Sequence, residues 1–193
     1  MPWEKTFDED KAVEAAMLLF WEKGYTDTSM ADLLKATGLT KGSFYNAFGS
    51  KYDLFLKALL KYDMENRCII LQELAATDSP VKSIKIFLNS LVDESVEDTN
   101  KKGCFIVNTA VDVGSHKGEI RQIIAKGLGE VEAFFKKMIE LGQKKKDIPE
   151  SVDPQSTAKA LMGTVVGIRV LGRGIYDREA LQALTDQSLR LIR

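Results

Sequence analysis

Apolar residues recur every three or four positions along almost the whole chain, and this spacing limits the possible folds more than any other feature. The spacing places apolar side chains on one face of an α-helix, whereas a half-buried β-strand requires strict alternation. No stretch of useful length alternates, and no Asn-Gly or Asp-Gly pair marks a hairpin. The pattern therefore predicts an all-α protein.

Glycine, proline and capping residues divide this pattern into about nine helices. Pro80 and Pro154 each follow a capping residue and occupy the first helical position, where proline is favoured. The expected helices cover residues 8–23, 29–35, 40–48, 51–76, 80–98, 104–113, 119–145, 154–171 and 177–192. Three short helices followed by longer ones indicate an N-terminal domain over residues 1–50 and a larger one over residues 51–193.

Several classes of protein do not fit this sequence. No run approaches the roughly 18 apolar residues of a membrane span, and the first residues lack the apolar core of a signal peptide, so we expect a cytoplasmic protein. One histidine and two cysteines without C-x-x-C spacing argue against a metal site or a disulfide framework. No catalytic triad or carboxylate pair can be assembled, so we expect neither an enzyme nor a cofactor.

Charge is distributed unevenly along the chain. The formal net charge is -1, which by itself does not suggest a nucleic-acid ligand. Between residues 35 and 57, however, four lysines face one acid, Asp53, which leaves a local charge of +3. Only charge within about 10 Å matters at moderate salt, so this segment can still attract a phosphate backbone.

The stretch TKGSFYNAFGSK, residues 40–51, carries aromatic residues on a short and otherwise polar helix. With Phe44 pointing inward, Gly42, Ser43, Tyr45 and Asn46 fall on the sides and the outer face. A small polar helix supported by a three-helix core can enter the major groove of DNA. The alternative is a helical hairpin with only a structural role.

The segment KGYTDTSMADLLKATGLTKGSFYNAFGSKYDLF resembles the TetR family of bacterial transcriptional regulators. The resemblance is dense over residues 8–62, and beyond them only length and helical layout match. It implies a palindromic double-stranded DNA operator with one recognition helix in each half-site. The implied or expected DNA contacts are Thr28, Ser29, Thr40, Lys41, Gly42, Ser43, Tyr45, Asn46 and Lys51. Ala47 departs from the family, in which many members carry histidine, and this removes one contact.

The last two helices fit a homodimer interface. Residues 158–168 are apolar nearly all round the helix, and Leu181, Leu184, Leu191 and Ile192 form a stripe on the next one. Gly163 and Gly167, four residues apart, permit close approach of a second helix. The resemblance implies a four-helix dimer bundle here, and the alternative is that both helices complete a monomer core.

Apolar and adaptable side chains on the middle helices predict a pocket for a small-molecule effector of unknown identity. Its candidate residues are Phe87, Cys104, Phe105, Asn108, Phe134, Met138, Met162 and Arg169. Asn108 and Arg169 lie on otherwise apolar helices and could orient a polar ligand group. The favoured alternatives are a helix–helix hydrogen bond for Asn108 and an exposed ion pair for Arg169.

Cys104 begins a helix just after Lys101 and Lys102, and both a helix N-terminus and nearby cations favour a thiolate. The pattern Gly103, Cys104, Phe105, Asn108 resembles a TetR subgroup in which some members sense electrophiles or oxidants through this cysteine. The simpler interpretation is a small buried side chain. We expect Cys68 in the core and His116 in solvent.

The sequence therefore predicts a dimeric repressor that an effector, or modification of Cys104, releases from its operator. The alternative is a helical ligand-binding or scaffold protein without specific DNA binding, which the acidic first helix favours. The salt dependence of DNA binding separates the two.

Overall fold

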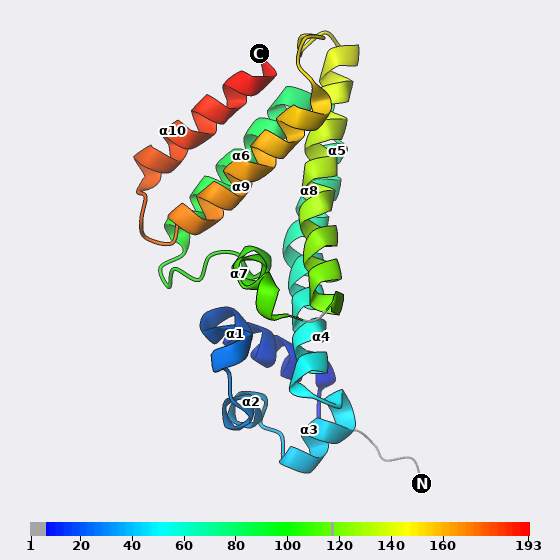
Figure 1. Ribbon diagram of the computed structural model, residues 1–193, viewed down its shortest axis with the longest axis vertical. Helices are drawn as coiled ribbons and strands as arrows, with labels where there is room; N and C mark the ends of the chain where they lie inside the picture. The colour runs from blue at the N-terminus through cyan, green and yellow to red at the C-terminus, as the bar shows by residue number, and fades with distance from the viewer. Residues whose placement is uncertain (1–6, 117) are drawn as a thin grey trace.

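The computed structural model describes residues 7–116 and 118–193, and within these ranges the regular structure is helical (Figure 1). The predicted all-α class is confirmed. Residues 1–6, at the start of the predicted N-terminal domain, lie outside the described residues, as does residue 117 in the predicted break between helices. The helices are α1 (Glu9–Asp27), α2 (Met30–Thr37), α3 (Lys41–Phe48), α4 (Lys51–Asp63), α5 (Ile69–Ala75), α6 (Pro80–Glu97), α7 (Phe105–Val111), α8 (Gly118–Lys144), α9 (Pro154–Leu171) and α10 (Arg178–Ser188).

The long helix predicted over residues 51–76 contains a π-helical turn. This turn, η1 (Met64–Cys68), joins α4 to α5, and the backbone at both junctions stays in the right-handed helical region. When α4, η1 and α5 are counted as one rod, the described ranges contain nine helical segments, as predicted. The apolar spacing did not reveal the π-turn, because one wide turn leaves most of the buried stripe in place.

Gly24 ends the regular part of the first helix, as predicted. Its φ of 79° and ψ of 169° lie outside the helical region, and one further turn follows to Asp27. A residue with a Cβ adopts this positive φ only at a cost, so glycine is favoured here. The kink turns the end of α1 back toward α4, where Tyr25 packs on Phe20 and Phe55.

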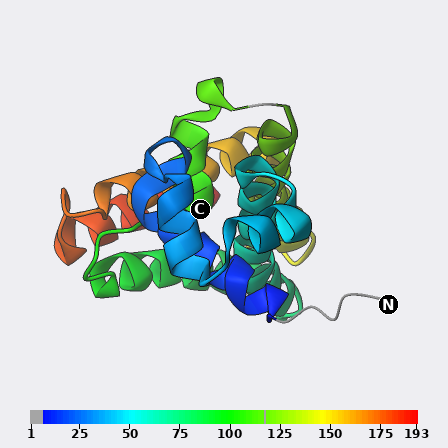
Figure 2. The ribbon, with the colours of Figure 1, turned by 90° about the horizontal axis from the view of Figure 1, so that it is seen from below.

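Two apolar cores divide the molecule. One core joins α1 to α4 and includes Phe20, Leu33, Phe44 and Phe55, and the other joins α5, α6, α8, α9 and α10. Figure 1 shows α4 rising from the end formed by α1 to α3, with α8 running beside the α4–α5 rod. Figure 2 looks onto that end of the molecule.

The helix α7 lies between the two groups of helices (Figure 1). Its residues Phe105 and Ile106 pack in the core of α1 to α4, together with Ile120 and Ile124 from the start of α8. A movement of α7 therefore reaches the N-terminal helices directly. No helix in the described part of the chain is long and apolar enough to cross a membrane.

Candidate nucleic-acid interface and effector cavity

Two short helices, α2 and α3, form a helix-turn-helix supported by buried side chains. Leu33 of α2 and Phe44 of α3 are fully buried, and Phe48 is nearly so. Gly38 ends α2 in the left-handed region with φ 70°. Thr40 then caps α3, and its Oγ1 accepts a hydrogen bond from the Ser43 backbone N–H at 3.2 Å. These contacts fix the outer face of α3 relative to the core.

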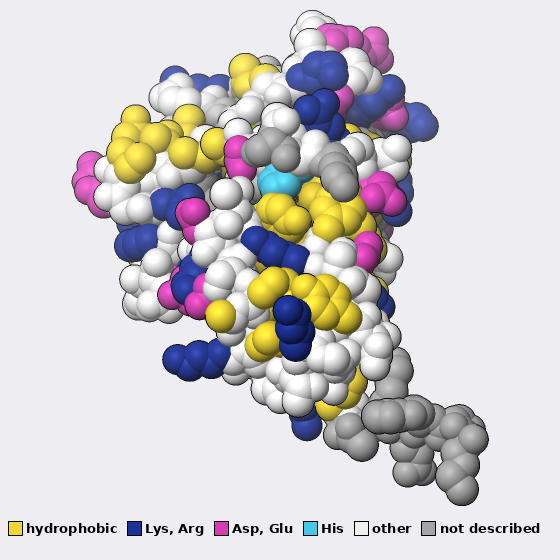
Figure 3. All heavy atoms as spheres, turned by 60° about the horizontal axis from the view of Figure 1, so that its bottom comes forward, with side chains coloured by type: hydrophobic (Ala, Val, Ile, Leu, Met, Phe, Trp, Pro, Cys, Tyr) yellow, Lys and Arg dark blue, Asp and Glu magenta, His cyan; other side chains and the backbone are white. Residues whose placement is uncertain are grey.

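The outer face of α3 carries the predicted polar residues. Lys41, Gly42, Tyr45 and Asn46 are exposed, and Ser43 is half-buried. A Cβ placed on Gly42 would meet no atom within 4 Å, so the surface is open there. Figure 3 views this end of the molecule: Lys and Arg side chains lie among hydrophobic ones near its middle, and Asp and Glu lie nearer its edges. The face suits a polyanionic partner with a groove.

Lys51 stands at the N-terminus of α4, directly after the capping residue Ser50. Its Nζ lies 4.5 Å from the centroid of the Tyr25 ring, a cation–π contact. Burial lowers the pKa of Lys51, and the charge of Asp27 opposes that shift. Asp53 also lies in this first turn, where its Oδ2 accepts a hydrogen bond from the Ser50 hydroxyl at 2.5 Å, so an acid stands beside the Lys51 ammonium.

Thr28 was wrongly predicted as a DNA contact. Its side chain is fully buried, and its hydroxyl donates to the Gly24 carbonyl at 2.6 Å, so the side chain closes the turn before α2. Ser29 is exposed, but its hydroxyl donates to Asp32 Oδ2 at 2.8 Å in a capping box. That hydrogen bond, together with Lys23, lowers the pKa of Asp32 to about 2. The charged Asp32 carboxylate makes the α2 N-terminus less suitable for a phosphate than that of α3.

A cavity of about 120 Å³ lies between α4, η1, α5, α6, α7, α8 and α9. Four of the predicted ligand residues line it: Phe87, Cys104, Met162 and Arg169. Most of the remaining wall is apolar, including Leu91, Val107, Val131 and Val165. Since a dry cavity of roughly 150 Å³ holds benzene, a ligand that fits without rearrangement is no larger than a single ring.

The other four predicted ligand residues do not line this cavity. Phe105 and Met138 are buried in the two cores, at 2% and 1% exposure. Phe134 borders a separate groove beside Cys68 and Lys137. Asn108 donates to the Lys102 carbonyl at 2.7 Å, and this carbonyl belongs to the loop before α7, so the bond is structural but is not the helix–helix bond considered from the sequence. The sequence could not separate these four from the cavity-lining residues, because apolar helix faces look alike in sequence whether they face a core or a cavity.

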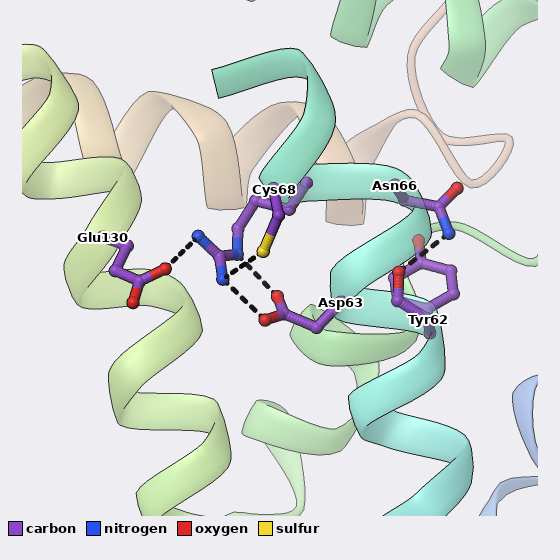
Figure 4. A network of polar contacts seen from close by, with 6 residues as sticks. Tyr62, Asp63, Asn66, Cys68 and Glu130 are labelled. Carbon is purple, nitrogen blue, oxygen red and sulfur yellow. Dashed lines mark hydrogen bonds and ion pairs between the residues drawn. The ribbon is translucent and has the colours of Figure 1, made fainter. Parts of the chain in front are cut away.

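One wall of the cavity is an ion-pair network that sequence reasoning missed (Figure 4). Arg67 donates from Nε to Asp63 Oδ1 at 2.5 Å and from a terminal nitrogen to Oδ2 at 2.6 Å. The same guanidinium pairs with Glu130 of α8 at 2.6 Å. These contacts, chiefly with Asp63, raise the pKa of Arg67 although burial opposes the shift. The four-residue spacing of Asp63 and Arg67 was the available signal.

Gly127 of α8 lies against this network. A Cβ on Gly127 would stand 3.7 Å from Arg67 Nε, an ordinary contact, but only 3.2 Å from Asp63 Oδ1, which is closer than side chains usually pack. Glycine thus lets α8 approach the α4–η1 junction. The network therefore joins the rod that carries the N-terminal helices to the longest helix of the C-terminal core.

Cys104 also lines the cavity, from the N-cap position of α7. Burial raises the pKa of Tyr62, and a hydrogen bond between its hydroxyl and Cys104 adds to the shift. Burial alone would lower the pKa of Arg169, but Cys104 and Glu94 outweigh it and the pKa is raised. Arg169 pairs with Glu94 at 2.5 Å, so the ion pair considered from the sequence is present, with a mostly buried arginine and a glutamate whose side chain is 50% exposed.

Two further predictions are wrong. His116 is buried and not solvated, because its ring packs against Tyr25 and Phe55. Cys68 is only partly buried and not in the core, and its Sγ accepts a hydrogen bond from Arg67 at 3.4 Å. Among the described residues, no three His, Cys, Asp or Glu side chains are placed to hold a metal ion.

The face of α9 and α10 carries small and apolar side chains. Gly163 and Val170 are exposed on α9, as is Leu191 just after α10, and Val166 and Leu184 are half-buried. A Cβ on Gly163 would meet nothing within 4 Å. Conversely, Leu161, Val165 and Ile168 are buried in the C-terminal core. The two helices thus complete that core and present a second apolar face outward.

Comparison with known proteins gives matches over both halves of the chain. Residues 12–58 match the model described as "Bacterial regulatory proteins, tetR family". Residues 80–187 match "Tetracyclin repressor-like, C-terminal domain", which covers more than half of the chain. The two matches coincide with the helix-turn-helix and with the helices that surround the cavity.

Individual relatives extend over nearly the full length. The transcriptional repressor ComR of Escherichia coli strain K12 is 27% identical, covering 97% of this chain and 90% of its own. The regulator CifR, solved as a cysteine mutant with a 26-base-pair double-strand operator, is 27% identical with a TM-score of 0.84, covering 97% of this chain and 98% of its own. Reduced NemR of Escherichia coli, at 19% identity and a TM-score of 0.86 over 95% of this chain and 96% of its own, shares the fold.

Proposed function

This chain belongs to the TetR family of DNA-binding transcriptional regulators, and from that premise we propose that it is a cytoplasmic homodimeric repressor. It binds a palindromic operator and leaves it when an effector enters the cavity or when Cys104 is modified. The observation that carries the proposal is the exposed polar face of α3, fixed by buried Phe44 and Phe48 at one end of the molecule. We assign residues 1–50 to DNA binding and residues 51–193 to effector binding and dimerisation.

The recognition helix is α3, one per half-site. Lys41, Gly42, Ser43 and Asn46 meet base edges or backbone in the major groove, and Gly42 permits close approach. Tyr45, Thr40 and Lys51 meet phosphates, which set the register of the protein on the duplex. Half-sites of a two-fold dimer then lie about one DNA turn apart, roughly 34–36 Å, or somewhat more.

The dimer forms through α9 and α10, whose outward face is apolar in the described structure. Gly163 and the partly exposed Val166 and Val170 allow a second copy of α9 to approach closely. A two-fold interface presents the same patch from both subunits, which suits a palindromic site. Each subunit then carries one α3 at its far end.

Release follows from the position of the cavity beside the α4–η1 junction. The walls include Tyr62, Asp63 and Arg67 from that rod, so a ligand there displaces the element that carries α1 to α3. An effector shifts the population only if it binds the released state more tightly than the DNA-bound state. A cavity of about 120 Å³ favours a small, largely apolar effector.

Cys104 offers a covalent route to the same change. Its thiol lines the cavity beside the Tyr62 hydroxyl and the Arg169 guanidinium. A thiolate that bonds to an electrophilic carbon adds new atoms to a cavity with little spare volume. The walls must then move apart, and α4 moves with them.

Fluorescence anisotropy on DNA from beside the gene tests the proposal, with reduced protein and with protein treated with a mild electrophile. Wild type, Cys104→Ser and Cys68→Ser are compared, and Cys68→Ser is the matched control because it is the other thiol of the chain. We expect salt-sensitive operator binding that treatment abolishes in wild type and in Cys68→Ser, but not in Cys104→Ser. Binding indifferent to treatment in all three would remove Cys104 from the mechanism.

The alternative is a helical ligand-binding or scaffold protein that does not bind DNA specifically. The Asp32 carboxylate at the α2 N-terminus and the acidic first turn of α1 favour it, because both repel phosphate. Such a protein would show no preference for any fragment. At every salt concentration its affinity for the candidate operator fragments would not exceed its affinity for DNA of random sequence.

A further inference from the structure

His116 links the C-terminal helices to the N-terminal ones through aromatic packing. It follows the turn η2 (Val113–Ser115), which continues α7, and is only 9% exposed. Its ring stacks on Phe55 of α4 with centroids 5.7 Å apart and an interplanar angle of 20°. It meets Tyr25 of α1 edge-on, also at 5.7 Å. Tyr25 and Phe55 lie 4.9 Å apart, so the three rings contact one another.

Besides the rings of His116, Phe55 and Phe20, the Tyr25 ring contacts the Lys51 ammonium, which lies 4.5 Å from its centroid. A cation over the face of an aromatic ring is attracted to it, so the orientation of the ring fixes the position of the cation. Lys51 is the first residue of α4 and carries a proposed phosphate contact. His116, Tyr25 and Lys51 therefore form a continuous series of contacts from the end of α7 to the DNA-binding face.

The other end of α7 is also attached to α1. Trp21 donates from its indole Nε1 to the Gly103 carbonyl at 3.1 Å, and Trp21 and Tyr25 lie four residues apart on α1. The next residue, Cys104, caps α7 and lines the cavity. The helix α7 thus spans from the cavity to the Tyr25 ring, with one contact to α1 near each end.

We propose that His116 is a positioning residue for operator binding, which holds the Tyr25 ring so that Tyr25 holds the Lys51 ammonium against a DNA phosphate. The inference rests on the proposed function, since it assigns a role in operator binding. A change in the cavity that moves α7 withdraws His116 from Tyr25 and frees Lys51. Control then reaches the DNA-binding face through α7 as well as through α4.

Five proteins test the inference: wild type, His116→Ala, His116→Phe, Lys51→Gln and the double variant His116→Ala/Lys51→Gln. His116→Phe keeps an aromatic ring in the site and serves as the matched control. Operator affinity is measured by anisotropy over a range of salt concentrations, and thermal unfolding checks that each variant is folded. A purely structural histidine would alter unfolding without changing the salt dependence that comes from Lys51.

We expect His116→Ala to weaken operator binding about tenfold and to reduce the salt slope by about two per dimer, one phosphate contact for each Lys51. His116→Phe should retain the wild-type affinity and slope. Lys51→Gln should reproduce the loss, and the double variant should lose no more than Lys51→Gln alone. Additive losses, or an unchanged slope in folded His116→Ala, would overturn the inference.

A second measurement needs no DNA. The Tyr25 ring shifts the NMR signals of the Lys51 side-chain methylene groups, which are assigned by comparison with Lys51→Gln. This shift should disappear in His116→Ala and persist in His116→Phe, and its persistence in both would overturn the inference. Absence of operator binding by the wild type would contradict the proposed function, while the NMR signals still decide whether His116 positions Lys51.

Discussion

Tyr45 lies on the exposed side of α3, and its ring meets the buried Phe44 edge-on with centroids 5.5 Å apart. The ring is thereby supported, which leaves the hydroxyl as the group that can bond a phosphate. We expect Tyr45→Phe to weaken operator binding about tenfold, because one hydrogen bond to a charged group is lost in each half-site. The melting temperature should not change.

Anisotropy titration and thermal unfolding check this expectation. Tyr176→Phe is a matched control, since Tyr45 and Tyr176 are both 43% exposed but Tyr176 lies in the loop after α9. Equal affinities of both variants and the wild type would remove the Tyr45 hydroxyl from the interface.

Burial gives His116 a measurable effect on stability. It lowers the pKa of His116 from its ordinary value of 6.5, although the Asp112 carboxylate at 3.9 Å opposes the shift. The rings of Tyr25 and Phe55 face it from α1 and α4, and Lys51 lies over the Tyr25 ring. The folded state therefore binds this proton less readily than the unfolded state, so the free energy of unfolding falls as pH drops below 6.5.

Urea unfolding of wild type and His116→Phe at pH 8, 6.5 and 5.5 isolates this contribution, because all other titrating groups are shared. The difference in free energy of unfolding between the two proteins should shift in favour of His116→Phe as the solution becomes more acidic. A difference independent of pH would show that the His116 pKa is the same in both states.

For single residues, the direction of a side chain on a short helix was easier to predict than the burial of a side chain in a loop. Lys41, Gly42, Tyr45 and Asn46 are exposed on α3, since the position of Phe44 determines their direction on a short helix. His116 was assigned to solvent because a Gly-Ser-His-Lys-Gly segment is polar in sequence. Only the aromatic slot between α1 and α4 makes its burial favourable, and that slot exists only after folding.

At the level of elements, the rod of α4, η1 and α5 depends on the Arg67 network. Arg67 and Asp63 have side chains only 12% exposed, and Arg67 also reaches across to α8. Removing one partner of a buried ion pair leaves the other charge unpaired. We expect Arg67→Met to lower the free energy of unfolding by about 3 kcal/mol.

The pair Lys61 and Glu65 gives the control on the same rod. It has the same four-residue spacing but is more exposed, so Lys61→Met should cost about 0.5 kcal/mol or less. Urea unfolding measures both variants. Equal losses would mean that the Arg67 network adds nothing beyond a surface ion pair.

Helix boundaries were predictable because each start and stop has a local chemical cause. Ser50, Asp153 and Asp177 each cap a helix with a side-chain hydrogen bond, and Gly24 and Gly38 leave the helix with positive φ. The lining of the cavity was predicted only in part, since four of the eight residues expected there line it. The cavity is the space that side chains from seven elements leave between them, and no local sequence pattern encodes such a space.

For the whole molecule, the open surface at Gly163 permits a direct test of assembly. A Cβ there would meet no atom of its own subunit within 4 Å, whereas a larger side chain would obstruct a second α9. We expect Gly163→Leu to remain folded, to become monomeric in sedimentation equilibrium, and to lose specific operator binding while retaining weak binding to any DNA.

Gly129→Leu on α8 is the matched control, because Gly129 is also helical, exposed and free of neighbours within 4 Å. It should stay dimeric and bind the operator normally. A dimeric Gly163→Leu would place the interface elsewhere on the molecule.

The π-turn η1 also affects where a related sequence can lose one residue without disturbing the packing of its helices. Successive helical residues are rotated by about 100° around the axis, and a π-turn accommodates one residue more than an α-turn. Deleting one residue within Met64–Cys68 can therefore convert the turn to regular α-helix and keep both flanking faces in register. The same deletion within α4 would rotate α1 to α3 by about 100° relative to the C-terminal helices. We infer that single-residue gaps among natural relatives concentrate in this turn.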